Sequence, residues 1–173
     1  GLTVTFPQGL RGDGLTAELI DALVAAGVRR FPLRITTASP RLQRLLKQNV
    51  DLRAASSALE RVAARGALGH IRIRLGIPTE TTGEVAHSIR WARESSAHTA
   101  SFLAGRDLDL GPAWTADSIG EDDDFKNLRR RALQSFYSCP RRTARLTLAL
   151  PQLLPRVLSR APRRLALVSR ALA

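Results

Sequence analysis

The sequence predicts an α/β fold, a partial (βα) TIM-like barrel of about four βα units with a C-terminal helical extension. Short β-rich runs alternate with longer runs of helical periodicity, at about 30–40 residues per unit, which is typical of parallel sheets. The net charge of +12 belongs almost wholly to the residues beyond 128. Because a closed barrel of this kind has about eight strands, and because the chain begins on a predicted strand, we expect a fragment whose other strands lie upstream.

The individual elements follow from local patterns. Four short apolar runs predict strands, at 2–6, 29–36, 70–75 and 99–104. Such runs are typical of strands covered on both faces. Apolar residues three or four apart predict helices, at 15–26, 40–46, 51–66, 82–93 and 125–137. Ser39 before Pro40, and Asp51, are typical N-terminal caps, whereas Gly27 and Gly66 are typical C-terminal ends.

Composition divides the chain into two predicted parts, a partial barrel at 1–115 and a basic helical extension at 116–173. The chain carries 27 basic and 15 acidic side chains. Residues 129–173 contain eleven arginines and no acidic residue, whereas residues 1–128 are nearly neutral. The excess positive charge therefore lies in the extension and not in the predicted barrel.

Composition also excludes several classes of protein. One cysteine, Cys139, excludes a disulfide framework and a metal site built from several cysteines. The sequence has no apolar run of about eighteen residues and no signal-peptide pattern at its start, so we expect a cytoplasmic protein. The histidines lack metal-ligand spacing. We assign no catalytic residue and no metal ligand within this chain.

Three stretches go beyond generic α/β patterning. The first, at residues 6–11, reads FPQGLR. The second, at 34–41, reads RITTASPR and is followed by LKQNVD at 46–51. The third, at 75–81, reads LGIPTET. Each of them follows a predicted strand or overlaps its end, where ligands bind in α/β barrels.

In this order the stretches resemble the second half of the radical S-adenosylmethionine (SAM) catalytic domain. The subgroup that they resemble is fused to cobalamin-binding domains and includes anaerobic porphyrin-ester cyclase and methyltransferase-like enzymes. The family stretches read roughly P-N-G-L-R, E-S-G-S-P followed by K-N, and G-L-P-G-E-T. The resemblance covers about residues 2–165, including the extension from Arg131 to Arg142. It implies a parent enzyme that cleaves SAM with a [4Fe-4S] cluster, for radical methylation, cyclisation or oxidation, and cobalamin held by a missing upstream domain.

The resemblance also implies a set of cofactor-binding residues. It places the ribose near two hydroxyl side chains and the adenine near a glycine–proline turn. The set comprises Thr36, Thr37, Ser39, Leu75, Gly76, Ile77 and Pro78.

The chain departs from the family pattern at several points. The cluster motif C-x-x-x-C-x-x-C is absent, Thr36 replaces an acidic residue, and Ala38 replaces a glycine. Residues 106–112 replace the usual P-x-P-G-T. One thiolate cannot hold a cluster that is usually tied by three. We therefore expect this chain to be inactive alone and to need the missing N-terminal half of the barrel, or a complementing chain.

Three strand arginines, Arg34, Arg72 and Arg74, are candidates for substrate binding, because guanidinium groups in a barrel lumen can hold a carboxylate. The alternatives are that the strand faces are reversed, or that these arginines pair with acidic residues. Glu80 has two interpretations as well, a residue that orients a ligand or a helix-capping acid.

The leucine- and arginine-rich extension leaves three interpretations open. Its leucines can pack back on the barrel with the arginines solvated. Its helices can lie on an anionic membrane surface, which would place the protein at the periphery of the inner membrane face. Its arginines can meet nucleic-acid phosphates, although Phe136 and Tyr137 are the only aromatic residues within residues 129–173 to stack on bases. The rival to the enzyme hypothesis is thus a non-catalytic module that binds a membrane, a nucleic acid or a partner protein.

Overall fold

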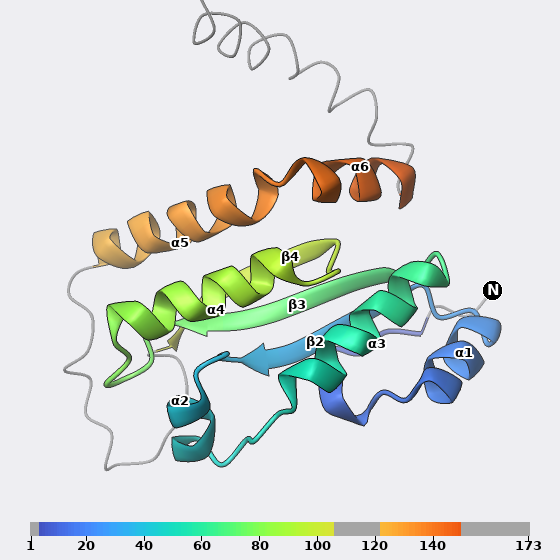
Figure 1. Ribbon diagram of the computed structural model, residues 1–173, viewed down its shortest axis with the longest axis horizontal. Helices are drawn as coiled ribbons and strands as arrows, with labels where there is room; N and C mark the ends of the chain where they lie inside the picture. Colours follow the sequence, from blue (N-terminus) through green and yellow to red (C-terminus); the bar gives the residue numbers. More distant parts are fainter. Residues whose placement is uncertain (1–3, 106–121, 150–173) are drawn as a thin grey trace, which may run out of the picture.

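A four-stranded parallel sheet forms the centre of the computed structural model, which describes residues 4–105 and 122–149 (Figure 1). Each strand pairs with the next one along the chain, in the order β1-β2-β3-β4. The strands are β1 (Leu10–Arg11), β2 (Arg30–Thr36), β3 (Leu68–Leu75) and β4 (Thr99–Ala104). This arrangement confirms the predicted partial βα barrel.

Helices connect the strands and cover one face of the sheet (Figure 1). They are the short 3₁₀ helix η1 (Gly12–Gly14), α1 (Ala17–Ala25), α2 (Pro40–Leu45), α3 (Leu52–Ala64), α4 (Thr82–Glu94), α5 (Asp122–Tyr137) and α6 (Pro140–Ala149). The predicted caps are confirmed: the Ser39 side chain accepts from the Leu42 N–H, and Asp51 accepts from two N–H groups of α3. Gly27 and Gly66 follow α1 and α3 with φ of +96° and +68°, a left-handed conformation that suits glycine.

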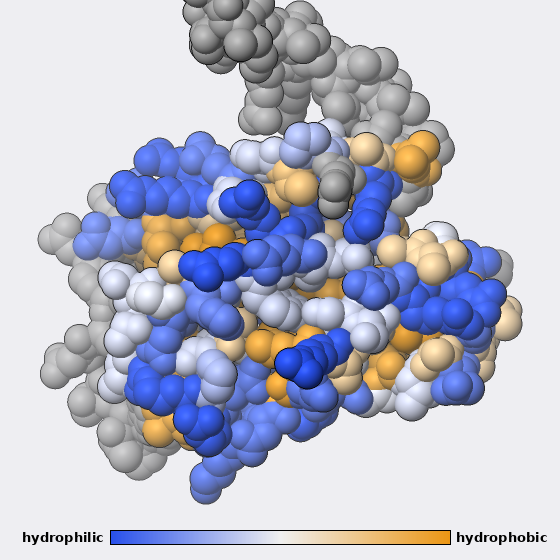
Figure 2. All heavy atoms as spheres, in the orientation of Figure 1, coloured by the Kyte–Doolittle hydropathy of each residue, from blue (hydrophilic) through white to orange (hydrophobic). Residues whose placement is uncertain are grey.

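Alternation along the strands determines which face is buried. In β3, Ile71, Ile73 and Leu75 are fully buried against the helices. The residues between them, His70, Arg72 and Arg74, lie on the opposite, concave face and are only partly buried. β2 shows the same alternation, with Phe31, Leu33 and Ile35 fully buried. Hydrophobic packing is therefore confined to the helix side, and hydrophilic residues cover much of the outer helix surface (Figure 2).

Two expectations from the sequence are wrong. No strand begins in residues 4–9: the first strand is Leu10–Arg11, and the rest of the predicted run, residues 2–3, lies outside the described residues. Gly9 turns the chain with φ +75°, and its N–H bonds Phe6 O, so only the residues after this turn reach β2. Coverage on both faces is also wrong, because Arg30 and Arg34 are exposed on the concave face.

The C-terminal helices pack back onto the barrel wall. The Phe136 ring of α5 meets the Phe102 ring of β4 edge to face, with centroids 6.3 Å apart. The Tyr137 hydroxyl accepts a hydrogen bond from the Ala100 N–H at 3.3 Å. Pro140 begins α6 instead of ending the helical region. These contacts favour the packing interpretation for residues 122–149, whereas residues 150–173 lie outside the described part.

Arg142 fastens α6 to the end of α4. Its buried guanidinium donates to the carbonyls of Ala92 (3.2 Å), Arg93 (2.5 Å), Ser95 (3.1 Å) and Ala97. It also lies over the Phe136 ring, 3.5 Å from the centroid. Burial lowers the pKa of Arg142 to about 10, so the side chain stays cationic at neutral pH. A cation is favourable here because the last carbonyls of a helix carry partial negative charge.

None of the helices in the described residues is both long enough and apolar enough to cross a membrane.

The role of Arg142 can be tested by substitution. Arg142→Ala should lower the free energy of unfolding by about 3 kcal/mol, because several buried carbonyls lose a charged donor. Arg129→Ala is the matched control, since Arg129 is exposed on α5, and it should change stability by less than about 0.5 kcal/mol. Urea unfolding followed by circular dichroism measures both. Similar values for the two variants would contradict the proposed role.

Candidate functional site

The carboxyl ends of β2, β3 and β4 meet at one edge of the sheet, as they must in a parallel arrangement. Thr36 ends β2, and Gly76 directly follows β3. Gly105 follows β4 so closely that a Cβ there would lie 2.4 Å from the Ile77 nitrogen and 2.6 Å from the Gly76 carbonyl carbon. Two loop backbones therefore touch at this edge, which is where α/β barrels bind ligands.

Thr36 has an unusual backbone. Its φ is +61°, although it is β-branched, and it is only 3% exposed. The pairing of β2 with β3 shifts register between Arg34 and Thr36. A non-glycine residue in this region costs about 1–3 kcal/mol, and such strain concentrates at functional sites. Thr36 and the Gly76 turn, with φ +74°, thus form an irregular edge between two regular strands.

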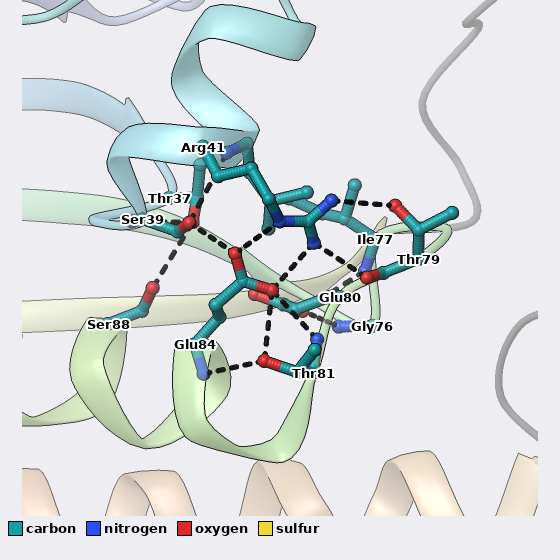
Figure 3. A network of polar contacts seen from close by, with 11 residues as sticks. Thr37, Ser39, Arg41, Gly76, Ile77, Thr79, Glu80, Thr81, Glu84 and Ser88 are labelled. Carbon is teal, nitrogen blue, oxygen red and sulfur yellow. Dashed lines mark hydrogen bonds and ion pairs between the residues drawn. The ribbon is translucent and has the colours of Figure 1, made fainter.

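A polar network centred on Glu84 ties the loop after β2 to α4 (Figure 3). Ser39 Oγ donates to Glu84 Oε1 at 2.6 Å. The Arg41 guanidinium donates to both carboxylate oxygens, at 2.9 and 2.7 Å. The Arg41 guanidinium, followed by Ser39 and Thr81, holds the pKa of Glu84 well below its usual range. Because Glu84 also forms the capping box of α4 with Thr81, one carboxylate fixes both loops.

Two buried hydroxyl groups hold the turn after β2. Thr37 Oγ1 and Ser88 Oγ lie 3.2 Å apart, and Ser88 Oγ accepts from the Ala38 N–H at 3.0 Å. Thr37 Oγ1 accepts from the Ser39 N–H at 3.1 Å. The Thr37 hydroxyl is therefore engaged within the protein.

Glu80 closes the turn after β3. Its Oε2 accepts from the Gly76 N–H at 2.6 Å and from the Ile77 N–H at 3.1 Å. Its Oε1 is buried and has no hydrogen-bond partner among the described residues. Burial raises the pKa of Glu80 to about 7. The capping interpretation of Glu80 is wrong, because Thr81 caps α4 and the Glu80 carboxylate bonds the turn after β3 instead.

The structure brings all the residues of the predicted cofactor site to this edge, and each of them is buried (Thr36, Thr37, Ser39, Leu75, Gly76, Ile77 and Pro78). The Leu75 side chain belongs to the helix-side core, so only its backbone remains for a ligand. Contact of these residues with a cofactor stays a prediction. Glu84 and Arg41 are not among the residues predicted for this site; the Thr81-x-x-Glu84 capping-box spacing was the available signal for Glu84.

The three predicted substrate arginines share the concave face. Arg34 and Arg72 are direct cross-strand partners. Arg72 donates to Pro7 O at 2.8 Å, and Arg74 donates to Ala104 O at 2.9 Å. Within the described residues, none of the three forms a salt bridge. Both alternatives from the sequence, reversed faces and pairing with acids, are therefore wrong for this part of the chain.

The residues of this chain do not fit a [4Fe-4S] cluster. The described part contains no group of three His, Cys, Asp or Glu side chains placed to hold a metal ion. The whole sequence has one cysteine, Cys139, which lies between α5 and α6. A cluster tied by about three thiolates would need ligands from outside these residues.

Comparisons with known proteins bear on the fold. No family model matches the sequence, and no curated protein matches it. Among solved structures, the chain is similar to coproporphyrinogen III oxidase (HemN) from Escherichia coli, a radical SAM enzyme, with a TM-score of 0.53 and 15% identity. The fold is radical SAM-like. The match covers 83% of this chain and 30% of HemN, so the chain corresponds to less than a third of that enzyme.

The pKa of Glu80 predicts a pH dependence of stability. Because the pKa rises from the ordinary 4.5 to about 7, the folded state keeps a proton that the unfolded chain releases. The stabilisation is complete below about pH 4.5 and is lost as the pH rises through about 7. Glu80→Gln should flatten this fall in unfolding free energy, measured by urea unfolding at several pH values.

Glu60→Gln is the control for that experiment, because Glu60 is exposed on α3. It should leave the slope between about pH 5 and 7 unchanged. An unaltered slope in Glu80→Gln would show that Glu80 titrates normally.

Proposed function

We propose that this chain forms part of the SAM-binding barrel wall of a radical SAM enzyme, with the adenosine of SAM against the edge of β2 and β3. The observation that carries the proposal is the free Oε1 of Glu80, buried beside the Gly76 turn and the edge at which β2 ends with Thr36. The radical SAM-like fold supports it, because ligands bind at the carboxyl edge of such barrels.

The residues at this edge suit the chemistry of an adenosine group. Glu80 Oε1 can accept from a ribose hydroxyl when ionised, or donate when protonated, since its pKa lies near 7. The Thr36 hydroxyl would lie toward the ribose, and Ile77 with the Gly76 backbone toward the adenine. Bound SAM would supply the carbon–sulfur bond whose reductive cleavage yields an organic radical. This chain would bind and orient SAM, and the cluster that reduces it would need protein ligands from elsewhere.

The concave arginines would serve the same enzyme by binding an anionic part of the substrate. Arg34 and Arg74 lie near the carboxyl ends of β2 and β3. Guanidinium groups bind carboxylates in a bidentate manner. Methylation, cyclisation and oxidation remain possible reactions of the parent enzyme. Membership of the cobalamin-associated subgroup stays a prediction, because HemN bears only on the fold.

A substitution pair tests the proposed SAM site. SAM should bind the 173-residue chain with a Kd of about 1 mM, measured by calorimetry, because only part of the barrel encloses the ligand. Gly76→Ala should raise the Kd at least about tenfold, since a side chain at φ +74° disturbs the turn.

Gly66→Ala is the matched control, with a similar φ of +68° at the opposite end of β3. It costs comparable backbone strain and should leave the Kd unchanged within about twofold. Thermal unfolding confirms that both variants fold. No binding at about 10 mM SAM, or equal effects of the two variants, would overturn the proposal.

A further inference from the structure

A second candidate site lies at the other end of the sheet, where β2 and β3 begin. There the structure has a hollow of about 450 Å³, a volume typical of small-molecule sites. Its lining comes from the N-terminal segment, the connection after α1, the start of β2 and the middle of β3 (Val4, Thr5, Phe6, Pro7, Gly27, Arg29, Arg30, Pro32, His70 and Arg72). We call it the amino-end hollow. None of these residues belongs to the proposed SAM edge.

The lining of the amino-end hollow contains three cationic side chains. The Arg30 side chain makes no hydrogen bond or ion pair within the described part of the chain, and it is exposed. Arg72 uses one N–H group on Pro7 O, which leaves the rest of its fork available. Arg29 bonds Val24 O at 2.9 Å. No acidic side chain lines the hollow, so these positive charges have no local counter-ion there.

His70 adds an oriented ring between the arginines. One ring nitrogen, Nδ1, lies 2.8 Å from Thr99 Oγ1, and the other, Nε2, lies 3.1 Å from Ser101 Oγ. Burial, with Arg72 and Arg30, lowers the pKa of His70, so it is neutral near pH 7. The ring therefore serves as a fixed wall of the hollow and adds no repulsion to the two guanidiniums.

The lining of the amino-end hollow also contains apolar side chains. Val4, Phe6 and Pro7 come from the N-terminal segment, and Pro32 comes from β2. The hydrogen bond from Arg72 to Pro7 O spans 65 residues of sequence and holds this segment across the concave face. The hollow thus combines apolar side chains with guanidinium groups.

Arg72 also has a like-charged neighbour, Arg34, which does not itself line the hollow. Arg34 and Arg72 are directly abreast on adjacent parallel strands, which lie about 4.8 Å apart. Like charges directly opposite each other destabilise a sheet. The four strands in the described part of the chain contain no acidic residue, so no strand side chain there neutralises this pair.

From this geometry we infer that the amino-end hollow binds a small amphipathic organic anion, with its carboxylate or phosphate between Arg30 and Arg72 and its apolar body against Phe6 and Pro32. The arginines favour a negatively charged group, and the apolar lining favours a ligand with a hydrophobic part. The inference is independent of the SAM edge, because the two places share no residue.

Binding of simple probes to the 173-residue chain tests the inference. Phenyl phosphate and phenylacetate combine an aromatic body with an anion, inorganic phosphate lacks the body, and benzyl alcohol lacks the charge. Calorimetry should give at least one aromatic anion a Kd about tenfold lower than those of inorganic phosphate and benzyl alcohol. The comparison of the two aromatic anions decides between phosphate and carboxylate.

Three variants locate the bound anion. Arg72→Gln and Arg30→Gln should each raise the Kd of the better probe about tenfold, because each removes a charged donor. Arg30→Gln is the safer variant, since Arg30 has no bond to lose within the described residues, whereas Arg72 also holds Pro7. Arg53→Gln is the matched control, because Arg53 is exposed on α3 and lies outside the hollow, and it should change the Kd by less than about twofold.

Several outcomes would overturn the inference. Equal weakening by Arg53→Gln and Arg30→Gln would show that the anion is not held in the hollow. Equal affinity for benzyl alcohol would show that charge is not recognised. No probe binding at about 10 mM would exclude the site. Because SAM titration uses the Gly76 turn and these probes use Arg30, failure of one experiment leaves the other intact.

Discussion

Alternation along β3 is the constraint on which the rest of the structure depends. Ile71 and Ile73 must face the helices to build a core, and a pleated strand then sends Arg72 and Arg74 to the other face. Because a shift of one residue would bury the arginines, hydrophobic burial fixes the register. The same constraint gives this half-barrel its cationic concave face without any direct interaction that favours one.

The carboxyl edge shows how irregular backbone is held in place. Thr36 adopts a strained conformation, and the Gly76 turn depends on the Glu80 carboxylate. Glu84 links the loops on both sides through Arg41 and the capping box. Buried hydrogen bonds that are fully satisfied make the loops rigid, whereas Glu80 Oε1 is buried without a hydrogen-bond partner among the described residues.

The two ends of the sheet differ in chemistry. The carboxyl edge offers backbone groups, hydroxyls and a carboxyl that titrates near neutrality. The amino end offers guanidiniums and apolar side chains around a hollow. The C-terminal helices serve neither end directly; α5 covers β4, and α6 is fastened to the end of α4 by Arg142. The described part of the basic extension therefore completes the outer layer of the barrel wall.

The sequence by itself determined the features that depend on local physics. Strand and helix order, the caps at Ser39 and Asp51, and the shared face of Arg72 and Arg74 follow from propensity and periodicity, so they were predicted. The tertiary structure alone decided the late start of β1, the four carbonyls around Arg142, the tie from Arg41 to Glu84 and the amino-end hollow. These features join residues distant in sequence, such as Arg72 and Pro7, 65 positions apart. Such contacts exist only after packing brings the segments together, and no local pattern specifies them.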